Sequence, residues 1–352
     1  MSERPNVILY HYPFSPYARK VFWYLRLRSI PFTQCIQPPI LPRPDLSTKL
    51  GITYRRIPVC AIDKDIYCDT SLILKELGKR FPFCITKTCG VKDLLADASE
   101  LGAGGANVGV VIELVENWAN EVFVVAGRLL PGNLPLLKDE KFLKDRGRYW
   151  APGAMSGTRE EALASMRRLF HAVETIFLGG GKKWILSGDK PTVADLMAIW
   201  PLDWVTTIPN ALSLDPTIPT AALITPTTYP LTFAWISRFQ SLCKSLPPGK
   251  TIVPTLTGQE AKENILAATA MASELGVDED DPLGLKKGEM VEVVPTDSGV
   301  LNPQRGRLLG LGIGEVVLEV DVPNTGGKVV RVHFPRRNYR ITRVEVEGKA
   351  NL

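Results

Sequence analysis

The sequence predicts three successive units: an α/β domain, an all-α bundle and a small all-β module. Strand and helix patterns alternate up to about residue 85, helical periodicity continues alone to about residue 248, and short period-two segments follow. A chain of 352 residues is long enough for two or three domains. The expected boundaries are 1–85, 91–248, a helical and acidic connector over 249–281, and 282–352.

The first unit combines strands with helices. Ser15 precedes Pro16 at the start of an amphipathic pattern, and these residue types are preferred as N-cap and first residue of a helix. The Pro-rich segment 38–44 indicates a loop. The expected elements are a strand over 7–10, a helix over 14–27, a strand over 32–36, strands over 57–62 and 65–67, and a helix over 69–80. This order is typical of a compact α/β domain.

The second unit shows helical periodicity only. Thr192 and Asp195 have the spacing of a capping box at the start of one helix. The most apolar helix carries Glu113, Glu116 and Glu121, so we interpret it as a buried helix and expect no membrane partner. The expected helices cover 91–101, 108–130, 159–177, 193–207 and 231–246.

The third unit follows a connector helix expected over 258–275 and an acidic break at 278–281. The segments MVEVV, EVVLEVDV, KVVRVHF and YRITRVEV predict short strands, most simply an SH3-like barrel. Four basic residues gather in HFPRRNYRITR: Arg336, Arg337, Arg340 and Arg343. Small nucleic-acid-binding barrels have such clusters, but a charged strand edge is the commoner explanation, so we do not expect a nucleic-acid partner.

Composition limits the class of protein further. Hydrophobic residues make up 45% and charged residues 22% of the chain, the balance of a soluble globular protein. The net charge of +5 is too small to indicate nucleic-acid binding by itself. Six cysteines without a CxxC motif, and three histidines, predict neither a disulfide framework nor a metal site. The N-terminus has no apolar signal segment, so we expect a cytoplasmic protein.

Four segments in chain order make residues 1–248 resemble a cytosolic glutathione S-transferase. YHYPFSPYARKV is similar to the start of that family's thioredoxin-like domain, and YRRIPVCAIDKDIYCDTSLILKEL to its stretch of cis-proline, hairpin and helix. WILSGDKPTVADLMAIWPLDW and YPLTFAWISRFQSL are similar to helices of its second domain, and FLKDRGRYW to fungal members. The chain resembles Ser-containing, tau-, omega- or zeta-like members, although a serine stands where the omega class has its catalytic cysteine. Residues 249–352 are not part of the usual family architecture.

The resemblance implies that glutathione binds as co-substrate or cofactor, without a metal. A free thiol has a pKa of about 8.5, so a hydroxyl donor and the positive end of a helix are needed to favour the thiolate. Ser15 occupies that place, although a plain N-cap role is the alternative. Tyr10, Tyr12 and Tyr17 are rival hydroxyls in the same segment, and we take Ser15 and Tyr17 as catalytic candidates.

Six residues are implied to hold glutathione: Lys49, Arg56, Ile57, Pro58, Asp69 and Thr70. A cis bond before the proline would turn the Ile57 backbone toward the cysteine of glutathione, and the Asp-Thr pair would bind the γ-glutamyl end at a helix N-terminus. Arg56, with Lys49 as a weaker candidate, would meet the glycyl carboxylate. The alternatives are an edge-strand proline, a helix cap without ligand and solvated surface cations. Cys60 and Cys68 are expected to be buried structural thiols.

The second substrate is expected to be a small apolar electrophile in a cleft between the first two units. Five aromatic residues of the bundle are candidates for its pocket: Trp118, Tyr149, Trp150, Trp200 and Trp204. Aromatic residues at helical spacing are more often core, so each has both interpretations.

Three functions remain open from the sequence. A glutathione transferase, in detoxification or secondary metabolism, would release the adduct; a glutathione-dependent cis–trans isomerase would regenerate glutathione; a non-catalytic interaction protein would act through its C-terminal module. The family resemblance implies a homodimer, which the extra module could block. The terminal Ala350-Asn351-Leu352 resembles a divergent peroxisomal address, with chance as the alternative.

Overall fold

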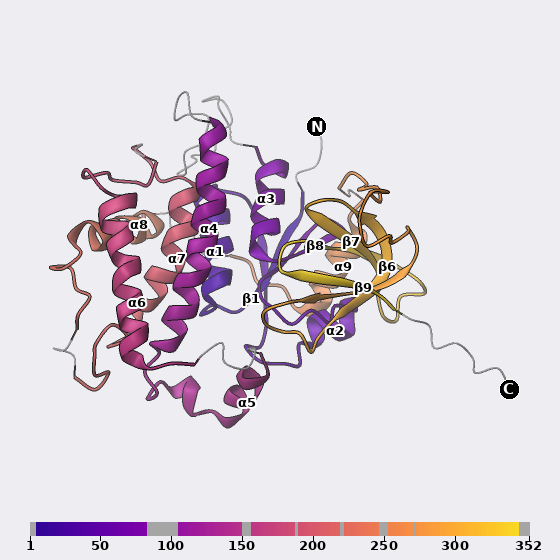
Figure 1. Cartoon of the computed structure of the whole chain (residues 1–352). Coiled ribbons are helices and arrows are strands. Elements are labelled where there is room, and N and C mark those ends of the chain that lie inside the picture. The colour runs from indigo at the N-terminus through magenta and orange to yellow at the C-terminus, as the bar shows by residue number, and fades with distance from the viewer. Residues whose placement is uncertain are drawn as a thin grey trace.

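The computed structural model describes residues 5–82, 105–149, 156–186, 189–218, 222–245, 253–269 and 272–344. A helical bundle lies on one side of the molecule, the C-terminal strands lie on the other, and the N-terminal domain stands between them (Figure 1). Within these residues, no helix is both long and apolar enough to cross a membrane.

The N-terminal domain has the predicted alternation of strands and helices. Its elements are β1 (Val7–His11), α1 (Pro16–Leu27), β2 (Thr33–Ile36), α2 (Pro44–Leu50), β3 (Val59–Ile62), β4 (Asp65–Cys68) and α3 (Thr70–Arg80). Strand β1 pairs in parallel with β2 and antiparallel with β3, and β3 pairs antiparallel with β4. Helix α2 is missing from the sequence expectation. Its signals were Pro44 at the first turn and Gly51, which ends the helix with φ 74°.

The second domain is helical. It contains α4 (Gly105–Arg128), the short 3₁₀ helix η3 (Pro135–Lys138), α5 (Glu140–Tyr149), α6 (Arg159–Ala172), the π-helical turn η4 (Val173–Phe177), α7 (Val193–Thr207) and α8 (Pro230–Lys244). The capping box at Thr192 is confirmed, because the Thr192 backbone N–H donates a hydrogen bond to Asp195 at 2.8 Å. Asp195 is fully buried and also accepts hydrogen bonds from the Ile185 amide and the Trp235 indole. The expected helix over 91–101 lies outside the described residues.

The C-terminal module is all-β, as predicted, but its sheet is open. After α9 (Gly258–Ala267) come β5 (Met290–Pro295), β6 (Gln304–Leu311), β7 (Glu315–Asp321), β8 (Val329–Pro335) and β9 (Tyr339–Arg343). The antiparallel order is β9-β5-β6-β7-β8. The expected SH3-like closure is not found, since no ladder joins β8 to β9 in the described residues. Instead β8 pairs in parallel with β4, which joins module and N-terminal domain into one nine-stranded sheet within the described chain.

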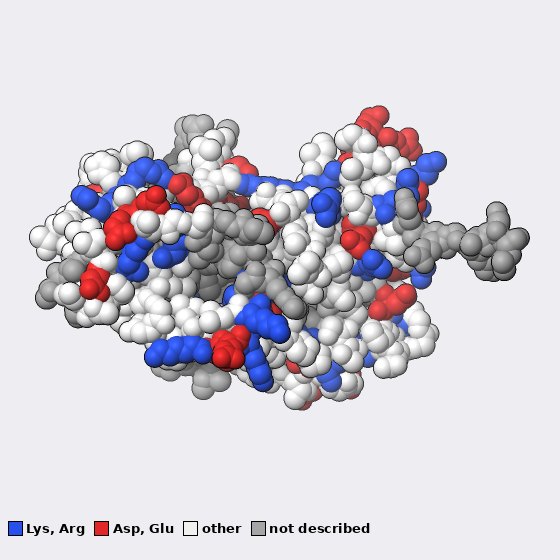
Figure 2. Space-filling model, turned by 60° about the horizontal axis from the view of Figure 1, so that its bottom comes forward, with Lys and Arg blue, Asp and Glu red and all other residues white. Residues whose placement is uncertain are grey.

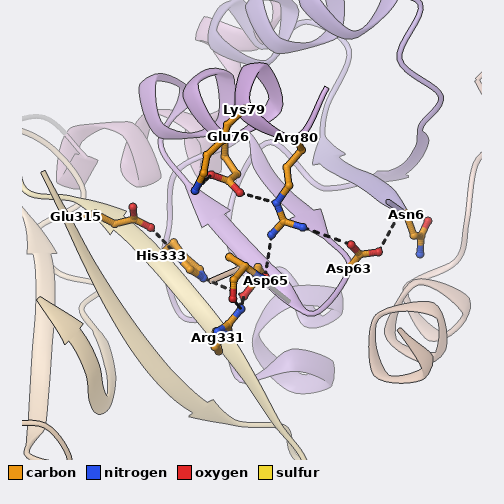
Figure 3. Close-up of polar contacts among 10 residues, drawn as sticks. Asn6, Asp63, Asp65, Glu76, Lys79, Arg80, Glu315, Arg331 and His333 are labelled. Atoms are coloured by element: carbon orange, nitrogen blue, oxygen red, sulfur yellow. Dashed lines mark hydrogen bonds and ion pairs between the residues drawn. The ribbon is translucent and has the colours of Figure 1, made fainter. Parts of the chain in front are cut away.

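A buried polar network marks this junction. Asp65 of β4 is 0% exposed and lies 2.6 Å from Arg331 and 3.1 Å from His333, both of β8. It also lies 3.3 Å from Arg80 of α3. Figure 3 shows Asp65 between these three partners, with Glu315 beyond the imidazole. Burial alone would raise the pKa of Asp65, but His333, the Ala272 amide and Arg331 together outweigh it and lower that pKa. The two domains are therefore joined by charge as well as by backbone pairing.

Candidate functional site

A cavity of about 160 Å³ lies where the three units meet. The N-terminal domain lines it with Tyr17, Tyr54, Arg56, Ile57, Pro58, Asp69, Thr70 and Ser71. Helix α4 contributes Glu116, Asn120, Phe123 and Val124, and the C-terminal module contributes Asp297, Ser298, Arg337 and Asn338. Five of the six residues proposed to hold glutathione thus surround one space, and Lys49 of α2 is not among the described residues that line it.

The N-terminus of α3 forms one end of the cavity. Asp69 is its N-cap with φ 74° and ψ 138°, outside the left-handed αL well that Asp tolerates, so its backbone is strained. Its Oδ1 accepts hydrogen bonds from the Ser71 amide at 3.0 Å and from the Ser71 hydroxyl at 2.9 Å. Thr70, as the first helical residue, has a backbone N–H without an intrahelical acceptor. The adjacent Ile57–Pro58 peptide is cis, as the resemblance implies.

The two catalytic candidates have different positions. Ser15 is the N-cap of α1, is 2% exposed, and its Oγ accepts a hydrogen bond from the Ala18 amide at 3.3 Å. The described residues that line the cavity include Tyr17 but not Ser15. The Tyr17 hydroxyl donates to Asn120 Oδ1 on α4 at 3.1 Å. Tyr17 is therefore the candidate hydroxyl that faces the cavity.

The rival hydroxyls of Tyr10 and Tyr12 do not line the cavity among the described residues. Tyr10 is 0% exposed, and burial raises the pKa of its hydroxyl well above the ordinary value. The Tyr12 hydroxyl accepts a hydrogen bond from Arg146 of α5 at 3.1 Å. The cysteines Cys60 and Cys68 are buried free thiols, and burial raises the pKa of Cys60 to about 12. Neither thiol is poised for reaction.

Glu116, which lines the cavity, forms a buried ion pair with Lys20. Lys20 of α1 is 1% exposed, and its Nζ lies 3.7 Å from Glu116 Oε1 and 5.5 Å from the ring centre of Trp200. Burial lowers the pKa of Lys20, against the opposing charges of Glu116 and Asp69. Burial likewise raises the pKa of Glu116, against the charge of Lys20. An uncompensated charge here would be costly, so the pair ties α1 to α4.

The tryptophans proposed for the substrate pocket pack against other aromatic side chains. Trp200 is 1% exposed and packs on Tyr17 with ring centres 4.4 Å apart, while Trp204 stacks on Phe123 at 5.3 Å. Trp118 packs on Phe177 in the bundle at 4.9 Å. These three indoles are not among the described residues that line the cavity. The Tyr149 side chain and Trp150 lie outside the described residues.

Sequence reasoning missed the contributions of α4 and of the C-terminal module. On α4, Glu116 and Asn120 lie one turn apart, and Val124 follows at the same spacing, so all lie on one face. Polar residues along one face of an otherwise apolar helix were the available signal. On the module, Arg337 lies 2.5 Å from Glu113 of α4 and Arg336 lies 2.5 Å from Asp281.

Basic and acidic groups are interspersed over the module on the face that Figure 2 shows. Arg343 also pairs with a carboxylate, at 3.1 Å from Glu289. Three of the four arginines of the cluster thus pair with carboxylates, and two of them, Arg336 and Arg337, lie in the turn between β8 and β9.

Comparison with known proteins agrees with this architecture. Residues 9–86 match the family model described as glutathione S-transferase, N-terminal domain, and residues 125–246 match a domain of unknown function, DUF7962. No curated protein matches the sequence. The fold is similar to that of a GST-like protein from Pseudomonas syringae, with a TM-score of 0.65 and 22% identity over 96% of this chain and 100% of that chain. Rice GST1, solved in complex with glutathione, has a TM-score of 0.48 and 16% identity over 75% of this chain and 96% of that chain.

The family match over residues 9–86 and the fold of the Pseudomonas protein establish a thioredoxin-like domain of the glutathione S-transferase type at the N-terminus, followed by a helical domain and a C-terminal β-sheet. Coverage of 96% of the chain by the Pseudomonas protein extends beyond residue 248. The C-terminal module is therefore part of a fold that occurs in at least one other protein.

Proposed function

We propose that this chain is a glutathione transferase-like enzyme that binds glutathione in the three-sided cavity and directs its thiolate to a small apolar electrophile. One observation carries the proposal. The N-cap Asp69, the first residue Thr70 of α3 and the cis Ile57–Pro58 peptide share one cavity with a tyrosine hydroxyl. The family resemblance implies this combination, and the N-terminal match over 9–86 supports it.

The groups present suit a zwitterionic peptide. The N–H of Thr70 at the positive end of α3 would receive a carboxylate, and the carboxylates of Asp69 and Glu116 would accept an ammonium group. The Ile57 backbone would pair with the peptide main chain. Glutathione supplies the sulfur nucleophile when bound. Phe123 and Val124 provide the apolar part of the lining, which suits an uncharged electrophile.

Thiolate stabilisation falls to residues at the start of α1. The Tyr17 hydroxyl faces the cavity, and it would turn from Asn120 to donate to the sulfur. The Ser15 hydroxyl is the alternative donor, since its oxygen accepts from Ala18 while its proton makes no hydrogen bond to other described residues. The positive end of α1 favours an anion in either case.

Calorimetric titration with reduced glutathione, together with ultraviolet thiolate absorbance, tests the proposal. We expect the wild type to bind and to show a thiolate signal near neutral pH. In Tyr17→Phe the thiol pKa should rise while binding changes little; Ser15→Ala should show the same result if Ser15 is the donor. Absence of binding at millimolar glutathione in the wild type would refute the proposed function.

The finer predictions need separate tests. Transferase and isomerase share the thiolate step, and they differ in whether glutathione is consumed with the electrophile; mass spectrometry of the products distinguishes them. Homodimer assembly can be tested by sedimentation. The proposed peroxisomal address at Ala350-Asn351-Leu352 lies outside the described residues, and a fluorescent fusion with and without these three residues would test it.

A further inference from the structure

The C-terminal module supplies one wall of the cavity. Two of its segments reach the space: Asp297 and Ser298 after β5, and Arg337 and Asn338 in the turn between β8 and β9. All four residues lie outside the segments 9–86 and 125–246 that match family models. Any contact that they make with a ligand is therefore additional to the site implied by the N-terminal domain.

Arg56, the residue expected to meet a carboxylate of glutathione, is already engaged by the module. Its guanidinium donates to the Ser298 carbonyl at 2.7 and 3.2 Å and pairs with Asp297. The guanidinium carbon also lies 5.8 Å from the ring centre of Tyr339. The Arg56 side chain is only 14% exposed. A ligand carboxylate would have to displace these contacts, so Arg56 is better described as an anchor for the module.

Arg337 is also ion-paired, but its side chain is more exposed than that of Arg56. Its side chain lines the cavity, is 40% exposed and pairs with Glu113 on α4 through Nη1 at 2.5 Å. Burial raises the pKa of Glu116, and the positive charge of Arg337 acts to lower it. Arg337 is therefore close enough to Glu116, on the cavity wall, to interact with it electrostatically. The turn is held close to α3, because the Tyr339 hydroxyl lies 3.4 Å from Asp69 Oδ2. Arg337 thus lies at the same end of the cavity as Asp69 and Glu116.

We infer that the C-terminal module completes the glutathione site, and that Arg337 binds the γ-glutamyl carboxylate opposite the N-terminus of α3. The inference rests on the proposed function. The γ-glutamyl end carries one carboxylate and one ammonium group. Asp69 and Glu116 give that end of the cavity two acidic groups for the ammonium. Lys20 is buried in its pair with Glu116, and Arg56 is paired with Asp297, so Arg337 is the more exposed cation that the carboxylate would meet near the positive end of α3.

The test compares three ligands and three proteins by calorimetry. The ligands are reduced glutathione, γ-aminobutyryl-cysteinylglycine, which lacks only the γ-glutamyl carboxylate, and glutathione glycyl ethyl ester, in which only the glycyl carboxylate is masked. The proteins are the wild type, Arg337→Gln and the control Arg340→Gln, which removes the same charge from an exposed residue of β9 that is not among the cavity-lining residues described. Urea unfolding of each variant checks that the fold is retained.

We expect wild type and Arg340→Gln to prefer glutathione over the analogue equally, and Arg337→Gln to lose about tenfold of that preference, as a charged hydrogen-bonded pair predicts. An unchanged preference in Arg337→Gln would overturn the inference while leaving the proposed function intact. The inference would also be overturned if Arg337→Gln lost the preference for glutathione over its glycyl ethyl ester and not the preference over the analogue. Arg337 would then contact the glycyl carboxylate. Failure of wild type and Arg340→Gln to bind glutathione would remove both proposals.

Discussion

The junction between β4 and β8 depends on the single carboxylate of Asp65. It faces Arg331, His333 and Arg80, and its Oδ2 also accepts the Ala272 amide at 2.5 Å. Asp65→Asn keeps the size of the side chain but removes the negative charge. Arg331 and His333 would then lose their shared negative partner while their side chains remain buried, at 11% and 4% exposure.

Breaking a buried ion pair by removing one partner costs about 3–5 kcal/mol of unfolding free energy. The exposed pair Arg307–Asp321 on the same module, at 3.6 Å with both side chains at least half exposed, provides the matched control. Asp321→Asn should cost less than about 1 kcal/mol, because exposed pairs contribute little. The expected difference between the two variants is therefore several-fold.

Urea unfolding followed by tryptophan fluorescence and circular dichroism measures both variants. We expect a clear decrease of the midpoint for Asp65→Asn and almost none for Asp321→Asn. Equal midpoints for the two variants would show that the Asp65 network does not stabilise the sheet, and the reasoning from burial would be wrong.

Two further predictions concern residues at the same boundary. Burial alone would lower the pKa of His333, but hydrogen bonds to Asp65 and Glu315 outweigh it and raise that pKa. Its contribution to stability is therefore present below the ordinary pKa of about 6.5 and is lost as pH rises through the raised value, so melting temperature should fall over that range in wild type but not in His333→Gln; parallel curves would contradict this. Gly51 has φ 74°, and an added Cβ would lie 2.5 Å from the Asp321 carbonyl, so Gly51→Ala should destabilise by at least about 1 kcal/mol in urea, and a neutral result would show that the backbone relieves this close approach without cost.

Local signals in the sequence were sufficient for most elements. The N-cap Ser15 before Pro16 predicted the start of α1, and the capping box at Thr192 predicted the start of α7. Alternating residues predicted β5, β7, β8 and β9 of the module, whereas β6 was missed. Such signals depend only on residues that are close in the chain, so they can be recognised in a single sequence. The grouping of Ile57, Pro58 and Asp69 in one site came from the family resemblance instead.

The pairing of β4 with β8 was beyond that kind of reasoning. Period-two alternation shows which face of a strand is buried, but it does not show which edge pairs with which. Here residues 65–67 meet residues 331–333, more than half the chain away. The available clue was chemical: Asp65 and His333 are charged or titratable residues inside two apolar strands, and buried groups of this kind need partners. The module's share of the cavity follows from this pairing and was missed with it.

This pairing predicts that the module and the N-terminal domain unfold together, although the sequence suggested separate domains. Phe334 of β8 is 0% exposed and packs on Tyr54 of the N-terminal domain, with ring centres 5.5 Å apart. Phe334→Ala should cost about 3–5 kcal/mol, and native-state hydrogen exchange should show lost protection in β3 and β4 as well as in β5–β9. Phe170→Ala, an equally buried change in α6, serves as the control. Loss of protection confined to β5–β9 would mean that the module is an independent domain that contacts β4. If the two parts shared one core, removal of the Phe334 ring would destabilise the strands on both sides of it.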